Sequence, residues 1–181
     1  MIYLALLRAV NVGGTNKIEM ARLKNIFEEA GFTKVRTFIA SGNVIFSSKS
    51  TDQAKLTRQI EAAIKAGFQI DVSVLLRDLG SIARLTKALP ASWVNDAGMK
   101  CDVMFLWKEQ DRPGIVDQMP FNPEVEDLKY FPGAVVWRID RINMAKSKML
   151  KLVGTKLHKQ LTVRNPNTVR KIYALMLDAQ T

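Results

Sequence analysis

Residues 7–17 read Leu-Arg-Ala-Val-Asn-Val-Gly-Gly-Thr-Asn-Lys, and this segment decides how the first part of the chain folds. An apolar run over residues 2–10 stops shortly before the glycine pair, and a helical pattern of apolar residues begins at Met20. The segment therefore predicts a strand, a tight polar loop and a helix. Adjacent glycines permit positive φ and close approach, and donors beside a helix start suit an anion. An anion cradle and an ordinary strand-to-helix turn both fit this pattern.

The composition is that of an ordinary globular protein, with 48% hydrophobic and 24% charged residues among 181. Apolar runs are all shorter than the roughly 20 residues of a membrane helix, so we expect no membrane partner. Residues 1–7 lack the leading positive charge of a signal peptide, and we interpret them as a strand.

Cys101 is the only cysteine and His158 the only histidine. This inventory excludes an intramolecular disulfide and a Cys-His metal cluster within one chain, and it favours a cytoplasmic location. We predict no metal and no cofactor. A nucleophilic Cys101–His158 pair requires the two residues to meet in space, whereas a lone cysteine on an alternating strand is more often a small core residue.

The net charge of +10 is concentrated in the second half of the chain. Residues 138–171 hold ten basic residues against one acid, Asp140, a local net charge of +9. The ten are Arg138, Arg141, Lys146, Lys148, Lys151, Lys156, Lys159, Arg164, Arg170 and Lys171. Such asymmetry is typical of polyanion-binding proteins, and a solvated basic face explains it equally well.

The order of predicted elements over residues 1–78 is strand, helix, strand, strand, helix, strand. The helices cover residues 20–30 and 52–66 and are followed by Gly31 and Gly67, and residues 40–43 connect two short strands as a hairpin. This order is the split βαβ arrangement of a ferredoxin-like plait.

A similar order recurs later. Asp78 caps a predicted helix over residues 79–89, and residues 91–99 form a connector. A strand over 101–107, a short helix over 114–119 and a hairpin of 127–131 with 134–140 follow. A basic helix over 145–153 is expected to direct Met149, Leu150 and Val153 toward a core, and Asn165-Pro166 opens a last helix.

We therefore predict an α/β (α+β) protein of two ferredoxin-like plait halves, with antiparallel sheets and helices on one face. The predicted divisions are 1–78, a helix and connector over 79–99, and a divergent half over 100–181.

The plait topology places two polar loops together. Its third strand lies antiparallel to the first, so Ser41-Gly42-Asn43 should neighbour residues 11–14. Backbone N–H groups, asparagine amides and Lys17 would there bind a phosphate or carboxylate. Alternatively, the amides bond to nearby backbone, and Arg8 forms a structural ion pair rather than an anion contact. The candidate ligand-binding residues in these loops are Arg8, Asn11, Gly13, Gly14, Lys17, Ser41, Gly42 and Asn43.

Two familiar nucleotide-binding motifs are excluded. A Walker loop requires Ser or Thr after its lysine, and here Ile18 follows Lys17. An RNA recognition motif shares the plait topology but carries a basic-Gly-aromatic pattern on its third strand, which residues 43–47 do not match.

In combination, residues 8–14, 20–23, 31–32 and 41–44 resemble the bacterial domain-of-unknown-function 1697 family. Ser147-Lys148 and residues 164–169 extend the resemblance over essentially the full length. The family typically has Gly-Ile at positions 9–10 and tryptophan at position 166, where this chain has Ala9-Val10 and Pro166. The resemblance implies two ferredoxin-like plaits and assigns no reaction, cofactor or catalytic residue.

The resemblance adds Lys148, Arg164, Asn165 and Asn167 to the candidate ligand-binding residues. Asn165 and Asn167 also stand at a predicted helix start, where free N–H groups favour an anion, with Arg164 immediately before them. Simple helix capping is the alternative for Asn165.

Three functions follow from these patterns. The first is a non-catalytic binder of a polyanion, above all nucleic acid, through residues 138–171. The second is an enzyme or sensor for a small phosphorylated or carboxylated ligand, although the residues identify no acid-base group. The third is a protein-interaction module, as a monomer or a homodimer.

Overall fold

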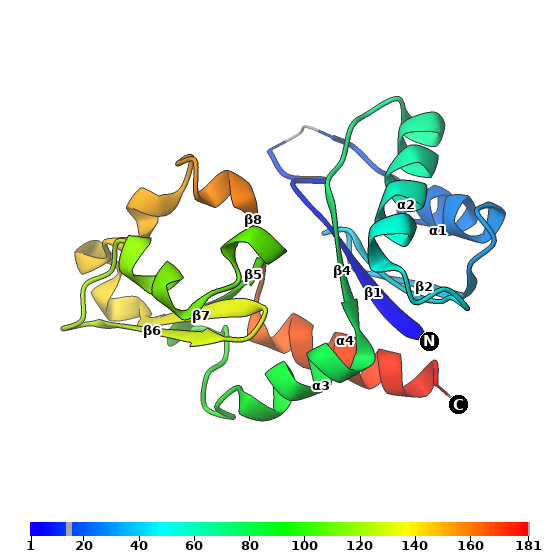
Figure 1. Cartoon of the computed structure of the whole chain (residues 1–181). Helices are drawn as coiled ribbons and strands as arrows, with labels where there is room; N and C mark the ends of the chain where they lie inside the picture. Colours follow the sequence, from blue (N-terminus) through cyan, green and yellow to red (C-terminus); the bar gives the residue numbers. More distant parts are fainter. Residues whose placement is uncertain (14–15, 181) are drawn as a thin grey trace. The chain divides into compact units, whose positions relative to one another are not determined.

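The computed structural model describes residues 1–13 and 16–180 and contains two compact units (Figure 1). Unit 1 consists of Met1–Ile82 together with Ile172–Thr181, and unit 2 of Ala83–Lys171. Each unit contains one four-stranded sheet. Among the described residues, no helix has both the length and the apolar character needed to span a bilayer.

The sheet of unit 1 has the strand order β2-β3-β1-β4, with antiparallel neighbours throughout. This is the order of a ferredoxin-like plait, as predicted. The elements are β1 (Ile2–Leu7), α1 (Met20–Glu29), β2 (Thr33–Phe38), β3 (Asn43–Ser47), α2 (Gln53–Phe68) and β4 (Val74–Asp78).

The central strand β1 is buried along its whole length, as its continuous apolar run predicts. Alternate β1 side chains, Tyr3, Ala5 and Leu7, pack in one core with buried residues of α1 and α2. Both helices lie on the same side of this sheet (Figure 1). Phe46 of β3 lies at the centre of this core, in ring contact with Tyr3, Phe27 and Phe32.

The helix α2 differs from its predicted end. Asp52 caps its start, because its Oδ1 accepts a hydrogen bond from the Lys55 N–H at 2.9 Å. Gly67 was predicted to stop the helix but lies inside it, and the left-handed residue at the end is Gln69, with φ of 58°. Gly67 serves helix packing instead, because a Cβ there would approach Ile26 Cδ1 of α1 to 2.3 Å.

Unit 2 repeats the same sheet pattern with the order β6-β7-β5-β8. Its strands are β5 (Met99–Leu106), β6 (Glu126–Phe131), β7 (Ala134–Asp140) and β8 (Leu161–Arg164). Sequence patterns predicted the first three and missed β8. The fold class predicted from the sequence, two plait halves with antiparallel sheets, is confirmed.

The connections between the strands of unit 2 are 3₁₀ segments rather than long helices. They are η1 (Lys108–Gln110) and η2 (Pro113–Gln118) after β5, and η3 (Arg141–Lys146), η4 (Met149–Leu152) and η5 (His158–Gln160) after β7. The helix α3 (Leu79–Ala88) precedes β5, with Asp78 accepting from the Ser81 N–H at 2.6 Å as its predicted cap. The helix α4 (Pro166–Asp178) follows β8.

The predicted basic helix over residues 145–153 is wrong. Ser147 has extended backbone, with φ of −65° and ψ of 130°, and separates η3 from η4. Met149 and Leu152 are buried, whereas Leu150 and Val153, predicted to face the core, are exposed. The physical reason is a tertiary contact, because the backbone N–H groups of Lys148 and Met149 donate to the buried carboxylate of Glu126.

Candidate functional site

The two polar loops of unit 1 are adjacent, as the topology predicts. Leu6 of β1 lies opposite Asn43 of β3, and the Leu7 N–H donates to the Gly42 carbonyl at 2.8 Å. A Cβ at Gly42 would lie 2.5 Å from Val10 Cγ2 and 2.7 Å from Leu7 Cβ, and its φ is +72°. Gly42 is therefore required both for its left-handed backbone and for the close approach of the loops.

The side chain of Asn11 holds the first loop together. Its Nδ2 donates to the carbonyls of Ile18 and Ala40 at 2.9 and 2.8 Å, and its Oδ1 accepts from the Ile18 N–H at 2.8 Å. Asn11 also has a φ of 54°, a conformation that asparagine tolerates better than most residues. Its amide therefore ties the loop to the start of α1 and to the β2–β3 connection.

Asn43 plays a similar part in the second loop. It is fully buried, and its Nδ2 donates to the Phe38 carbonyl and to Ser41 Oγ, both at 2.9 Å. These contacts match the alternative in which the asparagine amides bond to nearby groups of the chain. The role of these two residues in binding an anion stays a prediction.

The remaining candidates of unit 1 differ in accessibility. Arg8 is half-buried, and its backbone N–H donates to the Ser73 carbonyl at 3.0 Å. Gly13 and Lys17 are exposed, and Gly13 has a φ of 60°. Gly14 lies outside the described residues.

The candidates of unit 2 also make contacts within the chain. Arg164 is buried, its Nη1 donates to Thr162 Oγ1 at 3.1 Å and to the Val163 carbonyl at 2.7 Å, and burial lowers its pKa to about 10. Asn165 caps α4, its Oδ1 accepting from the Thr168 N–H at 2.8 Å. Asn167 Nδ2 donates to the Asn95 carbonyl at 2.9 Å, so it holds the connector before β5.

Glu126 organises the covering segments of unit 2, and sequence reasoning missed it. Its carboxylate accepts hydrogen bonds from Trp137 Nε1 at 3.1 Å and from the N–H groups of Lys148 and Met149 at 3.2 and 3.3 Å. Ser147 Oγ and the Asn122 N–H donate to it as well.

Burial acts to raise the pKa of Glu126, but the hydrogen bonds from Ser147, Asn122, Met149 and Lys148 outweigh it and the pKa is lowered. Glu126 is thus an ionised structural anchor. No periodicity in the sequence marks it, because all of its donors except the Asn122 N–H come from residues 11 or more positions further along the chain.

The ten basic residues of the 138–171 segment fall into two groups. The four arginines are engaged with the chain itself: Arg138 pairs with Asp127 and Asp140, and Arg141 donates to the Asp96 carbonyl. Arg164 is buried, and Arg170 donates to the carbonyls of Trp93 and Pro90 at 3.0 and 2.7 Å. The six lysines, in contrast, are all exposed.

Cys101 is not placed as a nucleophile. It is fully buried in β5, and burial raises its pKa to about 12. Its neighbours Lys100 and Asp102 line a pocket together with His158, and successive strand residues point to opposite faces. Cys101 therefore faces the other side of the sheet from that pocket.

The pocket in unit 2 has a volume of about 310 Å³. It lies between one face of the β5-β7-β8 sheet and the chain around η4 and η5. The lining residues are Lys100, Asp102, Met104, Trp137, Met149, Leu150, Leu152, Val153, His158 and Val163.

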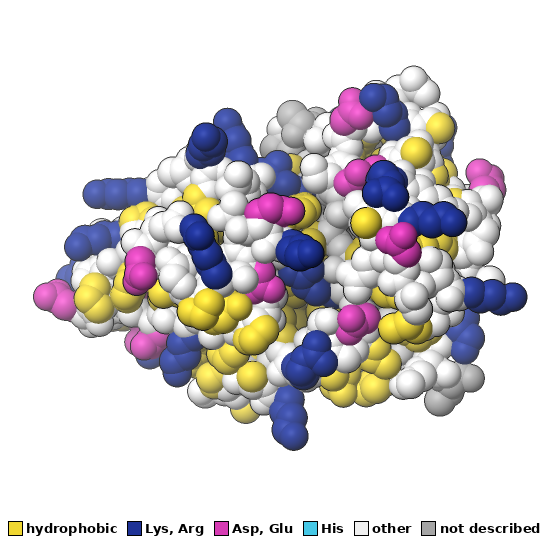
Figure 2. Space-filling view, viewed as in Figure 1, with side chains coloured by type: hydrophobic (Ala, Val, Ile, Leu, Met, Phe, Trp, Pro, Cys, Tyr) yellow, Lys and Arg dark blue, Asp and Glu magenta, His cyan; other side chains and the backbone are white. Residues whose placement is uncertain are grey.

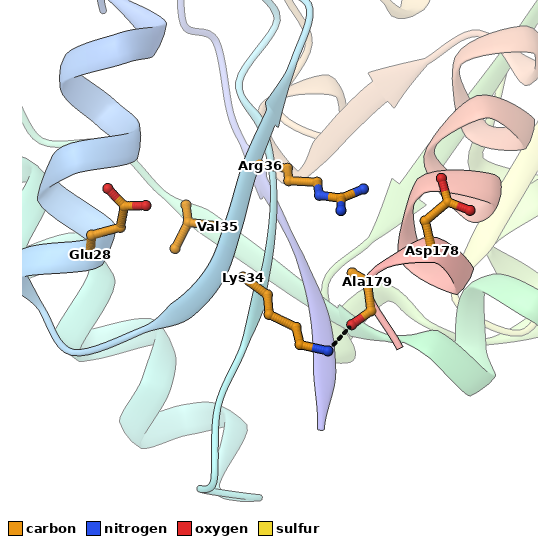
Figure 3. A pocket seen from close by; sticks show the side chains of 6 residues that line it. All are labelled: Glu28, Lys34, Val35, Arg36, Asp178 and Ala179. Carbon is orange, nitrogen blue, oxygen red and sulfur yellow. Dashed lines mark hydrogen bonds between the residues drawn. The ribbon is translucent and has the colours of Figure 1, made fainter. Parts of the chain in front are cut away.

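A second recess, of about 540 Å³, lies in unit 1 beside β2 and the end of α4 (Figure 3). Lys34 Nζ donates to the Ala179 carbonyl at 2.9 Å, which satisfies a terminal carbonyl of the helix. Lys34 and Arg36 are balanced there by Glu28 and Asp178, so the recess has no excess charge to attract an anion.

Two plaits with the same strand order define a duplicated ferredoxin-like α/β protein. The family model described as "Protein of unknown function (DUF1697)" matches residues 1–137, and the chain belongs to this family. The resemblance predicted from the N-terminal motifs is thereby confirmed, while Ser147-Lys148 and residues 164–169 lie beyond the matched residues.

The chain is also similar to a solved structure, that of the conserved bacterial protein SP0830 from Streptococcus pneumoniae. The two share 27% identity with a TM-score of 0.80, over 97% of this chain and 98% of that one. The comparison with curated proteins gave no match.

Proposed function

We propose that this protein is a non-catalytic binder of nucleic acid, which it holds by the phosphates through the lysine segment, residues 141–160. The supporting observation is that the arginines and the lysines of this part of the chain differ in their contacts. The arginines are engaged within the chain, whereas Lys146, Lys148, Lys151, Lys156 and Lys159 are exposed.

The lysine segment is free of opposing charge along the chain. No acidic residue occurs between Asp140 and Asp178. In Figure 2, Lys and Arg side chains project from the surface of unit 2, which contains this segment. Phosphate groups are the natural partners of such a surface, because neutralising them releases condensed counterions.

The chemistry of the segment supports binding without sequence preference. Lysine ammonium groups are flexible point charges, whereas base recognition relies on bidentate arginine, asparagine or glutamine. The segment also contains no Phe, Tyr or Trp on which bases could stack. We therefore expect similar affinity for unrelated duplexes of one length.

Fluorescence anisotropy with a labelled duplex of about two helical turns tests this function. With five phosphate contacts, affinity should fall about 500-fold between 50 and 200 mM salt. The variant Lys146→Gln/Lys148→Gln/Lys151→Gln should lower both the affinity and the salt dependence.

A matched control removes three exposed lysines of unit 1, in Lys24→Gln/Lys49→Gln/Lys55→Gln, and lowers the net charge by the same amount. This control should retain most of the affinity at 100 mM salt. Absence of binding at 50 mM salt, or equal losses in both triple variants, contradicts the proposal.

A further inference from the structure

We infer that the unit 2 pocket binds a small amphipathic anion, a carboxylate carried on an aliphatic chain. The inference concerns a ligand and a site distinct from the phosphate contacts of the exposed lysines. Its volume of about 310 Å³ lies within the range of small-molecule sites, which are mostly apolar with a few placed polar groups.

The walls of the pocket suit an aliphatic chain. The sheet contributes Met104, Trp137 and Val163, and the covering chain contributes four further apolar residues, Met149, Leu150, Leu152 and Val153. Leu150 and Val153 remain 49% and 66% exposed, although both border the pocket. A chain entering beside them would remove this apolar surface from water, which is favourable for each methylene buried.

Unbranched methionine side chains at two wall positions add adaptability. Met104 and Met149 can adjust their rotamers to a flexible ligand more readily than branched residues. The walls therefore favour a flexible alkyl chain over a rigid, highly polar molecule.

The polar groups of the pocket favour a negative head group. Lys100 Nζ lies 3.1 Å from Asp102 Oδ2 and 5.8 Å from the centre of the Trp137 ring, so the single carboxylate of the lining is already neutralised. The neighbouring Lys148, Lys151 and Lys159 add positive charge next to lining residues in the sequence. An ammonium head group would meet an excess of like charge here, whereas a carboxylate can share Lys100 with Asp102.

Isothermal titration with unbranched carboxylates tests the site on the full-length protein, using hexanoate, octanoate and decanoate below their micellar concentrations. We expect a stoichiometry of one and about tenfold tighter binding for every two added methylenes until the chain fills the pocket. Octylamine should bind at least tenfold more weakly than octanoate. Equal affinity for the amine and the carboxylate, or no dependence on chain length, overturns the inference.

A matched pair of variants locates the site. Val153→Asp places a charge at the pocket wall, whereas Ile142→Asp places the same charge on the lysine segment at a residue that is 92% exposed and does not line the pocket. Octanoate affinity should fall at least tenfold in the first variant and stay within twofold in the second. Equal effects would show that the pocket is not the site.

The same pair separates this inference from the proposed nucleic-acid function, because both variants add one negative charge to the lysine segment. DNA affinity should fall similarly in both, whatever happens to octanoate.

The variant Asp102→Asn supplies a test in which the expected result is a gain in affinity, and an unfolded protein could not produce such a gain. Removal of the carboxylate frees Lys100 for the ligand, so octanoate should bind several-fold more tightly. Weaker binding in this folded variant would overturn the placement of the ligand head group at Lys100.

Discussion

The indole Nε1 of Trp137 donates a hydrogen bond of 3.1 Å to the carboxylate of Glu126 inside unit 2. Both side chains are buried, at 2% and 4% exposure. The same carboxylate accepts hydrogen bonds from the N–H groups of Lys148 and Met149 at the start of η4. It therefore links the sheet to the covering segment that contains η4. A buried anion with this many donors determines where the lysine segment lies on its own sheet.

Glu126→Gln should destabilise the fold by about 2–4 kcal/mol. The substitution removes the charge and presents an NH₂ group to neighbouring donors, which leaves some of them unsatisfied. Urea denaturation followed by tryptophan fluorescence measures the loss. The substitution Glu124→Gln, at an exposed residue two positions before Glu126 and just ahead of β6, should change stability by less than about 0.5 kcal/mol.

Glu126 should also contribute to acid sensitivity. Its pKa is lower in the folded protein than in the unfolded chain, so its stabilising effect is complete above the unfolded value of about 4.3. The effect is lost as the pH falls through the lower, folded pKa. Between pH 7 and pH 3, Glu126→Gln should therefore lose less stability than the wild type. If the stability of the two proteins changed with pH in parallel, the pKa of Glu126 would not be lowered in the folded state.

The connection between β2 and β3 offers a second test, at Gly42. Gly42→Ala introduces a Cβ at 2.5 Å from Val10 and 2.7 Å from Leu7, on a backbone with φ of +72°. Strain and overpacking together should cost about 3 kcal/mol or more.

Gly31→Ala is the matched control, because Gly31 has a φ of +88° with nothing within 4 Å of its added Cβ. It should cost only the backbone strain, about 1–2 kcal/mol. Thermal unfolding of the two variants measures the difference, and equal costs would mean that close packing at Gly42 is unimportant.

Sequence patterns predicted unit 1 well because its helices have clean apolar faces and its central strand is continuously apolar. They failed where tertiary contacts decide local structure. Met149, Leu150 and Val153 are compatible with helical spacing. The N–H groups of Lys148 and Met149 instead donate hydrogen bonds to Glu126, and this segment forms a short 3₁₀ turn. The strand β8 escaped prediction because it has only four residues and ends in a buried arginine.

The candidate site was less predictable for a chemical reason. An asparagine amide beside a glycine suits a bound anion and a backbone carbonyl equally well, so the pattern at Asn11 and Asn43 could not separate the two. Charge counting likewise could not separate the arginines that hold the fold from the exposed lysines, because contacts such as Arg170 with Pro90 and Trp93 depend on the tertiary structure.

Cys101 should be inert to thiol reagents in the native protein. Its pKa is raised to about 12 by burial, so neither access nor thiolate is available at pH 8. DTNB should react with less than one tenth of the protein in an hour under native conditions and fully in denaturant. The variant Lys156→Cys, with a new thiol at an exposed position, should release one equivalent rapidly. Rapid reaction of the native wild type would contradict the burial of Cys101.

A double-mutant cycle tests the packing of α1 on α2 at Gly67. Alanine in a helix is ordinarily favoured over glycine by up to about 1 kcal/mol, but here its Cβ would approach Ile26 Cδ1 to 2.3 Å. Gly67→Ala alone should therefore destabilise the protein by about 1–2 kcal/mol.

Ile26→Val removes the Cδ1 atom that causes this conflict. It should cost about 1 kcal/mol alone, and adding Gly67→Ala to it should be neutral or stabilising. The coupling free energy between the two changes, measured by urea denaturation, should thus exceed about 1 kcal/mol in the direction of rescue. Additive effects would indicate that the helices separate to accept the new methyl group, and that the close approach at Gly67 does not fix their spacing.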